Sequence, residues 1–98
     1  MIINKNMEQA TLFFAPIGRL DTTTAPEFED ELVASLDGVK KLVLDFKDVA
    51  YISSAGLRVI LKVQKLMSAN GAMKITGVNS MVMEVFEITG FADILTIE

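Results

Sequence analysis

The sequence predicts a single α/β domain, a mixed β-sheet with a parallel core flanked by helices. Segments rich in strand-forming residues alternate with segments of helical periodicity, and this alternation implies right-handed crossovers between parallel strands. An opening pair of strands, joined by a tight polar turn, adds an antiparallel part. A later strand is a continuous apolar run, as in central strands covered on both faces. The expected order over residues 1–98 is β-β-α-β-α-β-α-β.

Short runs of β-branched, aromatic and other apolar residues, bounded by turn-forming residues, predict five strands. They cover residues 1–6, 10–17, 41–46, 73–76 and 94–97. Pro16 cannot donate a hydrogen bond to a ladder, so we expect it at a strand end, a bulge or an edge. The strand at 41–46 is the one expected to have both faces covered.

The first helix is expected at residues 25–36, where apolar residues recur on one face. These are Ala25, Phe28, Leu32 and Leu36. Thr24 and Glu27 have the spacing of a capping box, in which each side chain bonds the backbone of the other residue. A second helix is expected at 54–69, ended by Asn70 and Gly71. A short third helix contains Val82 and Phe86.

The second helix has a narrow basic stripe and an unusually broad apolar arc. Arg58, Lys62 and Lys65 form the stripe. The arc extends from Val59 and Leu66 over more than half of the circumference, which is more than one sheet face requires. Either a neighbouring helix or a partner protein is therefore expected to cover part of it.

Composition excludes several classes of function. The net charge of −4 disfavours nucleic acid as a partner, because phosphate binding needs a basic surface. The absence of Cys excludes a disulfide framework. No apolar run approaches the ~18 residues needed to span a bilayer, and the first residues lack the pattern of a signal peptide. These observations predict a cytoplasmic protein without direct membrane insertion.

The residues offer little for catalysis. Without His or Cys, neither a Ser-His-Asp triad nor a His- or Cys-based metal site can form. The glycines form no nucleotide-binding motif, and no cofactor is expected. Asp21, Asp45 and Asp48 could gather near the two serines discussed below, although turn and cap roles fit their spacing better. We therefore expect a protein that is not an enzyme.

Ser53 and Ser54 stand where an apolar strand region passes into the second helix. Ser is a favoured N-cap residue, because its side-chain oxygen can accept a hydrogen bond from the first turn. The same place has the positive end of the helix dipole and tolerates an anion such as a phosphate ester. A plain N-cap and a modification site are both consistent with this spacing.

Four segments together resemble the signature of the STAS domain, and more narrowly the bacterial anti-sigma factor antagonists, or anti-anti-sigma factors. The segments are 18–21 (GRLD), 42–46 (LVLDF), 49–58 (VAYISSAGLR) and 89–91 (TGF). The similarity covers nearly the whole chain in order. It implies a small sheet flanked by helices and a regulatory function exercised through protein contacts.

In this family, an anti-sigma factor of the serine kinase type phosphorylates a Ser or Thr at the start of the second helix, and a PPM-type serine phosphatase removes the phosphate. The unmodified antagonist binds the anti-sigma factor and frees the sigma factor. Many members carry Asp-Ser-Ser-Gly or Asp-Ser-Thr-Gly at this turn. Aligned on Gly56, this chain has Ser53 at the Asp position and Ala55 at the second hydroxyl position. The resemblance therefore implies Ser54 as the acceptor and Ser53 as the fallback, or a member that is not phosphorylated.

Further expectations concern the surroundings of the serines. By the resemblance, Asp21 and Asp45 line the rim of the site. Val59 and Leu66 are expected to supply partner-binding energy, while Arg58 and Lys62 give orientation and association rate. The alternative function is that of a docking or regulatory subunit of a membrane transport assembly, which uses the same fold without phosphorylation.

Overall fold

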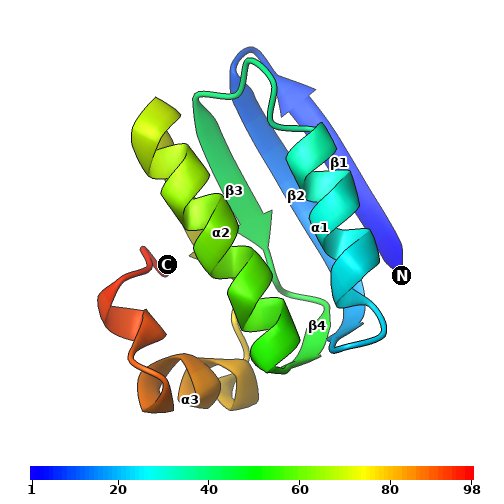
Figure 1. Cartoon of the computed structure of the whole chain (residues 1–98), viewed down its shortest axis with the longest axis vertical. Coiled ribbons are helices and arrows are strands. Elements are labelled where there is room, and N and C mark those ends of the chain that lie inside the picture. The colour runs from blue at the N-terminus through cyan, green and yellow to red at the C-terminus, as the bar shows by residue number, and fades with distance from the viewer.

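The computed structural model describes all 98 residues and confirms the predicted fold class (Figure 1). The strands are β1 (Ile2–Glu8), β2 (Thr11–Leu20), β3 (Lys41–Asp45), β4 (Val49–Ile52) and β5 (Ala72–Thr76). The helices are α1 (Ala25–Ala34), α2 (Ser54–Asn70) and α3 (Ser80–Ile88), followed by the 3-10 turn η1 (Phe91–Asp93). None of the helices is both long enough and apolar enough to cross a membrane.

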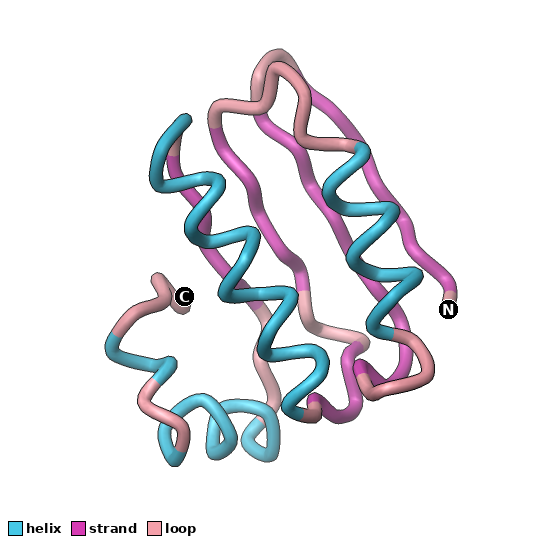
Figure 2. The backbone as a smooth tube through the Cα atoms, in the orientation of Figure 1, coloured by secondary structure: helices cyan, strands magenta, loops and turns pink.

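The sheet has the strand order β1-β2-β3-β5, and β4 pairs with β2. β1 and β2 are antiparallel, whereas the other pairs are parallel. Helices α1 and α2 lie side by side across one face of this sheet (Figures 1 and 2). Helix α3 packs against β4 at one end of the sheet.

Strand β2 changes partner along its length, and this change creates β4, which the sequence did not predict as a separate strand. Its first part, Thr11 to Phe14, pairs with β3, and its last part, Gly18 to Leu20, pairs with β4. Gly18 has φ 113°, and the register shifts directly after it. Pro16 lies between the two pairings, where neither β3 nor β4 is paired with it.

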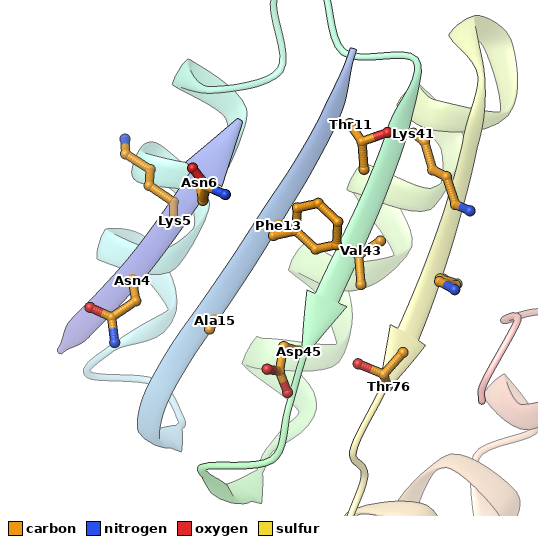
Figure 3. Close-up of a pocket in the computed structure, with 11 residues that line it drawn as sticks. Asn4, Lys5, Asn6, Thr11, Phe13, Ala15, Lys41, Val43, Asp45 and Thr76 are labelled. Atoms are coloured by element: carbon orange, nitrogen blue, oxygen red, sulfur yellow. The ribbon is translucent and has the colours of Figure 1, made fainter. Parts of the chain in front are cut away.

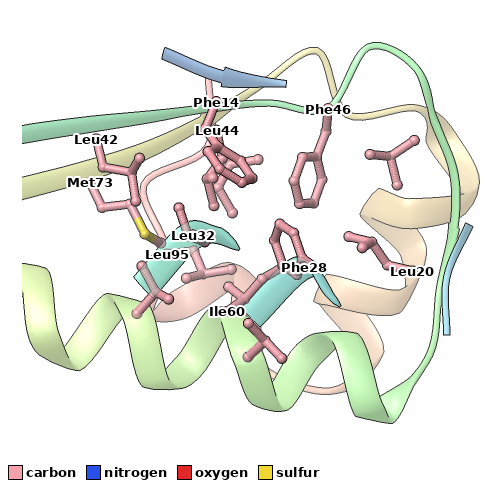
Figure 4. Close-up of a cluster of buried hydrophobic side chains, with 14 of the residues drawn as sticks. Phe14, Leu20, Phe28, Leu32, Leu42, Leu44, Phe46, Ile60, Met73 and Leu95 are labelled. Carbon is pink, nitrogen blue, oxygen red and sulfur yellow. The ribbon is translucent and has the colours of Figure 1, made fainter. Parts of the chain in front are cut away.

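The hydrophobic core lies between the sheet and the two long helices (Figure 4). The rings of Phe14 on β2 and Phe28 on α1 have centroids 5.9 Å apart, and Leu44, Phe46 and Ile60 are completely buried. Burial of side chains of this size stabilises a fold by about 1.5–3 kcal/mol each. This core holds α2 and the end of β2 together.

The prediction that β3 is covered on both faces is wrong. Val43 and Asp45 point to the face opposite the helices, where Figure 3 shows a shallow depression that also involves Phe13 and Thr76. No helix lies on this face. Val43 is nevertheless buried, because side chains of the flanking strands surround it.

Two local predictions also differ from the structure. The capping box is absent, because the Thr24 hydroxyl donates to the Arg19 carbonyl at 2.6 Å, and Glu27 instead contacts the Met1 amino group at 2.6 Å. The expected last strand at 94–97 is reduced to a single bridge between Ile75 and Ile97.

Candidate functional site

The two serines occupy the turn that connects β4 to α2, and the backbone of this turn is fixed at both sides. The Ser53 N–H donates to the Leu20 carbonyl of β2 at 2.8 Å. The Ser53 carbonyl accepts the first helical hydrogen bond, from the Leu57 N–H at 3.0 Å. Ser53 is the N-cap, with extended φ −103° and ψ 178°, and Ser54 is the first residue of the helix. The start of α2 is therefore attached directly to the end of β2.

Gly56 allows this close attachment. A Cβ atom at this position would lie 2.9 Å from Cγ1 of Ile52 and 3.1 Å from Cβ of Leu20. Both neighbours are buried core residues that cannot move easily. The first turn of α2 can thus approach β2 only because residue 56 has no side chain.

The two serine hydroxyls differ in accessibility. Ser54 is exposed at the first turn of the helix. The Ser53 hydroxyl oxygen is buried and has no hydrogen-bond partner, so the expected N-cap hydrogen bond is not formed. Of the two serines, Ser54 is therefore the one whose side chain another protein can reach.

Arg19, Asp21 and Tyr51 form a cluster of contacts at the ends of the two strands β2 and β4 that lead to this turn. β2 and β4 place Arg19 opposite Tyr51, with the guanidinium carbon 4.3 Å from the ring centroid. Arg19 also approaches the Asp21 carboxylate at 3.6 Å. Sequence reasoning gave Arg19 and Tyr51 no role, because the pairing of β2 with β4 was not predicted.

Asp21 organises the loop that precedes α1. Its carboxylate accepts hydrogen bonds from the Thr24 N–H at 3.2 Å and the Thr23 N–H at 3.0 Å. The Thr24 N–H, with smaller contributions from the Thr23 N–H, the Thr24 hydroxyl and Arg19, lowers the pKa of Asp21 below its usual value. Asp21 directly follows Leu20, whose carbonyl accepts from the Ser53 N–H, and its role as a rim residue stays a prediction.

Asp45 does not join this cluster. Its carboxylate accepts from the Lys47 N–H at 3.1 Å and lies on the sheet face opposite α2 (Figure 3). The expectation that Asp45 lines the serine site is therefore not met, because alternation along β3 directs its side chain away from the helices.

The outer face of α2 is basic and begins at the serine turn. Arg58 is exposed and lies four residues after Ser54, so both are on one side of the helix. Lys62 contacts Glu29 of α1 at 2.6 Å, whereas Arg58 and Lys65 have no acidic partner within 4.0 Å. The helix contains no Asp or Glu. This face therefore has a net positive charge next to the accessible hydroxyl.

The breadth of the apolar arc of α2 has a simple explanation. Val59 is only 4% exposed and belongs to the core, because α1 packs beside α2. The expected contact of Val59 with a partner stays a prediction, and this packing leaves almost none of its side chain accessible for it. Leu66 is 39% exposed in a groove between the carboxyl ends of α1 and α2. It is twelve residues from Ser54, about 18 Å along the helix.

Comparison with known proteins identifies the family of this chain. Residues 3–98 match the STAS domain family. The chain is 42% identical over 82 residues to the putative anti-sigma factor antagonist BtrV of Bordetella bronchiseptica, an alignment that covers 82% of this chain and 71% of BtrV. The chain belongs to the STAS domain family, among its anti-sigma factor antagonists. An anti-sigma-B factor antagonist of Staphylococcus aureus is 32% identical over 80 residues, covering 80% of this chain and 74% of the relative.

Solved structures show the same fold. The anti-sigma factor antagonist SpoIIAA in its unphosphorylated form superimposes with a TM-score of 0.83 and 16% identity, covering 99% of this chain and 88% of SpoIIAA. The phosphorylated form of SpoIIAA from Bacillus has a TM-score of 0.75 and 15% identity, covering 99% of this chain and 91% of SpoIIAA. At these identities the likeness supports the fold and no residue assignment.

Proposed function

We propose that this STAS protein is the phosphorylation-controlled antagonist of a partner-switching pathway in the cytoplasm. The unmodified form binds an anti-sigma factor of the serine kinase type and releases its sigma factor. Phosphorylation of Ser54 by that kinase blocks binding, and a PPM-type phosphatase restores it. The protein itself performs no catalysis. The observation that carries the proposal is the exposed Ser54 hydroxyl at the start of a basic helix, beside a Ser53 hydroxyl that is buried.

The charge of α2 explains how a phosphate could act as a switch. The outer face of the helix carries Arg58, Lys62 and Lys65 and no acidic residue, so the complementary partner surface is acidic. A phosphate adds about −1.5 to −2 charges at pH 7. On Ser54 it would sit at the start of the face that this acidic surface contacts, and it would repel that surface.

The same phosphate should leave the fold intact. It would lie at the positive end of the α2 dipole, near the N–H groups of the first helical turn, and this environment stabilises anions. The switch is therefore expected to act on binding and not on unfolding. A phosphorylated form of the structural relative SpoIIAA is consistent with this expectation.

Mapping of the phosphate by mass spectrometry tests the proposal. The protein, Ser54→Ala and the matched control Ser53→Ala would each be incubated with the cognate anti-sigma kinase and ATP. We expect phosphate on the wild type and on Ser53→Ala, and none on Ser54→Ala. Phosphate on Ser54→Ala would move the acceptor to Ser53. A wild type that is unmodified in its native cell and purifies with a transport complex would favour the docking-subunit function instead.

A further inference from the structure

The last quarter of the chain has an acidic excess as large as the net charge of the whole protein. Residues 75–98 contain the acidic side chains Glu84, Glu87, Asp93 and Glu98 and no Lys or Arg. The nine remaining acidic residues are balanced by all nine basic residues in 1–74, so the net charge of −4 belongs to this segment. Only Glu98 has an ion-pair partner, Lys74 at 3.2 Å.

Helix α3 presents large apolar side chains among these unpaired acids. Met81 is 57% exposed and Ile88 is 77% exposed. They are seven residues apart and therefore share one side of the helix, while Val82 and Phe86 face the core. Glu84 and Glu87 adjoin them. We call Met81, Glu84, Glu87 and Ile88 the α3 patch.

The α3 patch is attached to the strand that leads into the serine turn. The Asn79 side chain, which caps α3 by accepting from the Val82 N–H at 2.8 Å, also donates to the Val49 carbonyl of β4 at 3.0 Å. In Figure 1, α3 lies across the end of the molecule where α2 begins. A protein that docks at the start of α2 could therefore reach α3 as well.

We propose that the α3 patch is a second contact with the same anti-sigma factor, and that it binds an apolar groove bordered by Lys and Arg. This inference rests on the proposed function. Burial of Met81 and Ile88 in the partner's groove would supply binding energy, and Glu84 and Glu87 would favour a groove bordered by basic residues. The outer face of α2 is basic, whereas the α3 patch is acidic. A partner with an acidic surface for α2 and a basic border for α3 can therefore bind in one orientation, and like charges oppose the reversed orientation.

Calorimetric titration with the purified cognate anti-sigma factor tests this contact. The α3 variant is Met81→Gln with Ile88→Gln, and the matched control is Met7→Gln with Ile2→Gln on β1, where both side chains are also exposed. We expect about tenfold weaker binding or more for the α3 variant and less than about twofold change for the control. The double variant Glu84→Gln with Glu87→Gln should weaken binding less than the apolar double variant does, and it should reduce the salt dependence of binding. The control Glu8→Gln on β1 should leave both the affinity and its salt dependence unchanged.

The outcomes separate the two proposals. Absence of wild-type binding would overturn the proposed function, and with it this contact. Wild-type binding that the α3 variants leave unchanged would overturn the α3 contact alone. Sedimentation velocity of the isolated protein provides the remaining control, because self-association that the α3 variants abolish would assign the patch to a second copy of the chain and also overturn the inference. Unchanged melting temperatures would show that the variants fold.

Discussion

At the scale of single residues, the two serines of the β4–α2 turn have different roles because only one hydroxyl is accessible. Ser53 supplies backbone hydrogen bonds to Leu20 and Leu57, and its side chain makes none. Ser54 contributes an exposed hydroxyl at a helix start. The proposed modification therefore falls on Ser54, while the backbone of Ser53 fixes the turn.

Ser53→Ala should change the free energy of unfolding by less than about 0.5 kcal/mol, because the mutation removes no hydrogen bond. A Ser that caps a helix through its side chain typically costs about 0.5–2 kcal/mol when replaced by Ala. Urea unfolding monitored by circular dichroism measures the difference. A loss near 2 kcal/mol would mean that the Ser53 hydroxyl caps α2 in solution.

Asp21 is expected to make stability depend on acidic pH. Its folded-state pKa is lowered from 3.8, chiefly by the Thr24 N–H. The stabilisation is therefore present above the unfolded pKa and is lost as the pH falls through the lower folded value. Between about pH 5 and pH 2, wild type should lose more unfolding free energy than Asp21→Asn. Equal losses in wild type and Asp21→Asn would contradict the stabilising role of the Asp21 carboxylate.

At the scale of elements, α2 has two faces with separate functions. Its inner face packs on the sheet and on α1, which explains why Val59 is buried. Its outer face is basic and begins at Ser54. The arrangement allows surface changes on α2 without changes in the core.

Val59→Thr and Leu66→Gln should separate these faces. The threonine hydroxyl would enter a buried contact between helices and cost about 1–3 kcal/mol of stability. Leu66→Gln should cost less than about 1 kcal/mol, because the side chain is 39% exposed. Urea unfolding gives both values. Equal losses would contradict the assignment of Val59 to the core and Leu66 to the groove.

At the scale of the whole molecule, the strongly periodic elements could be predicted from the sequence and the long-range pairings could not. Helix α2 and strand β3 appear where their apolar patterns indicate. Strand β4 has four residues and forms only because β2 extends past β3, which no local pattern indicates. Arg19 and Tyr51 were missed for the same reason. Asp45 was misplaced because its orientation depends on which face of β3 the helices cover.

The same scale explains why the protein suits a switch. A rigid core fixes the β4–α2 turn, and opposite charges separate on α2 and α3. We therefore expect a phosphate on Ser54 to change the surface and to leave the frame unchanged. Binding and stability should respond independently to phosphate.

The most direct measurement compares the affinity of the cognate anti-sigma factor for protein carrying phosphoserine at position 54 and for unmodified protein. Calorimetry of both forms, with melting temperatures recorded by circular dichroism, gives the result. We expect the phosphorylated form to bind at least about tenfold more weakly, about 1.4 kcal/mol, with an unchanged or slightly higher melting temperature. Equal affinities of the two forms would contradict the central claim.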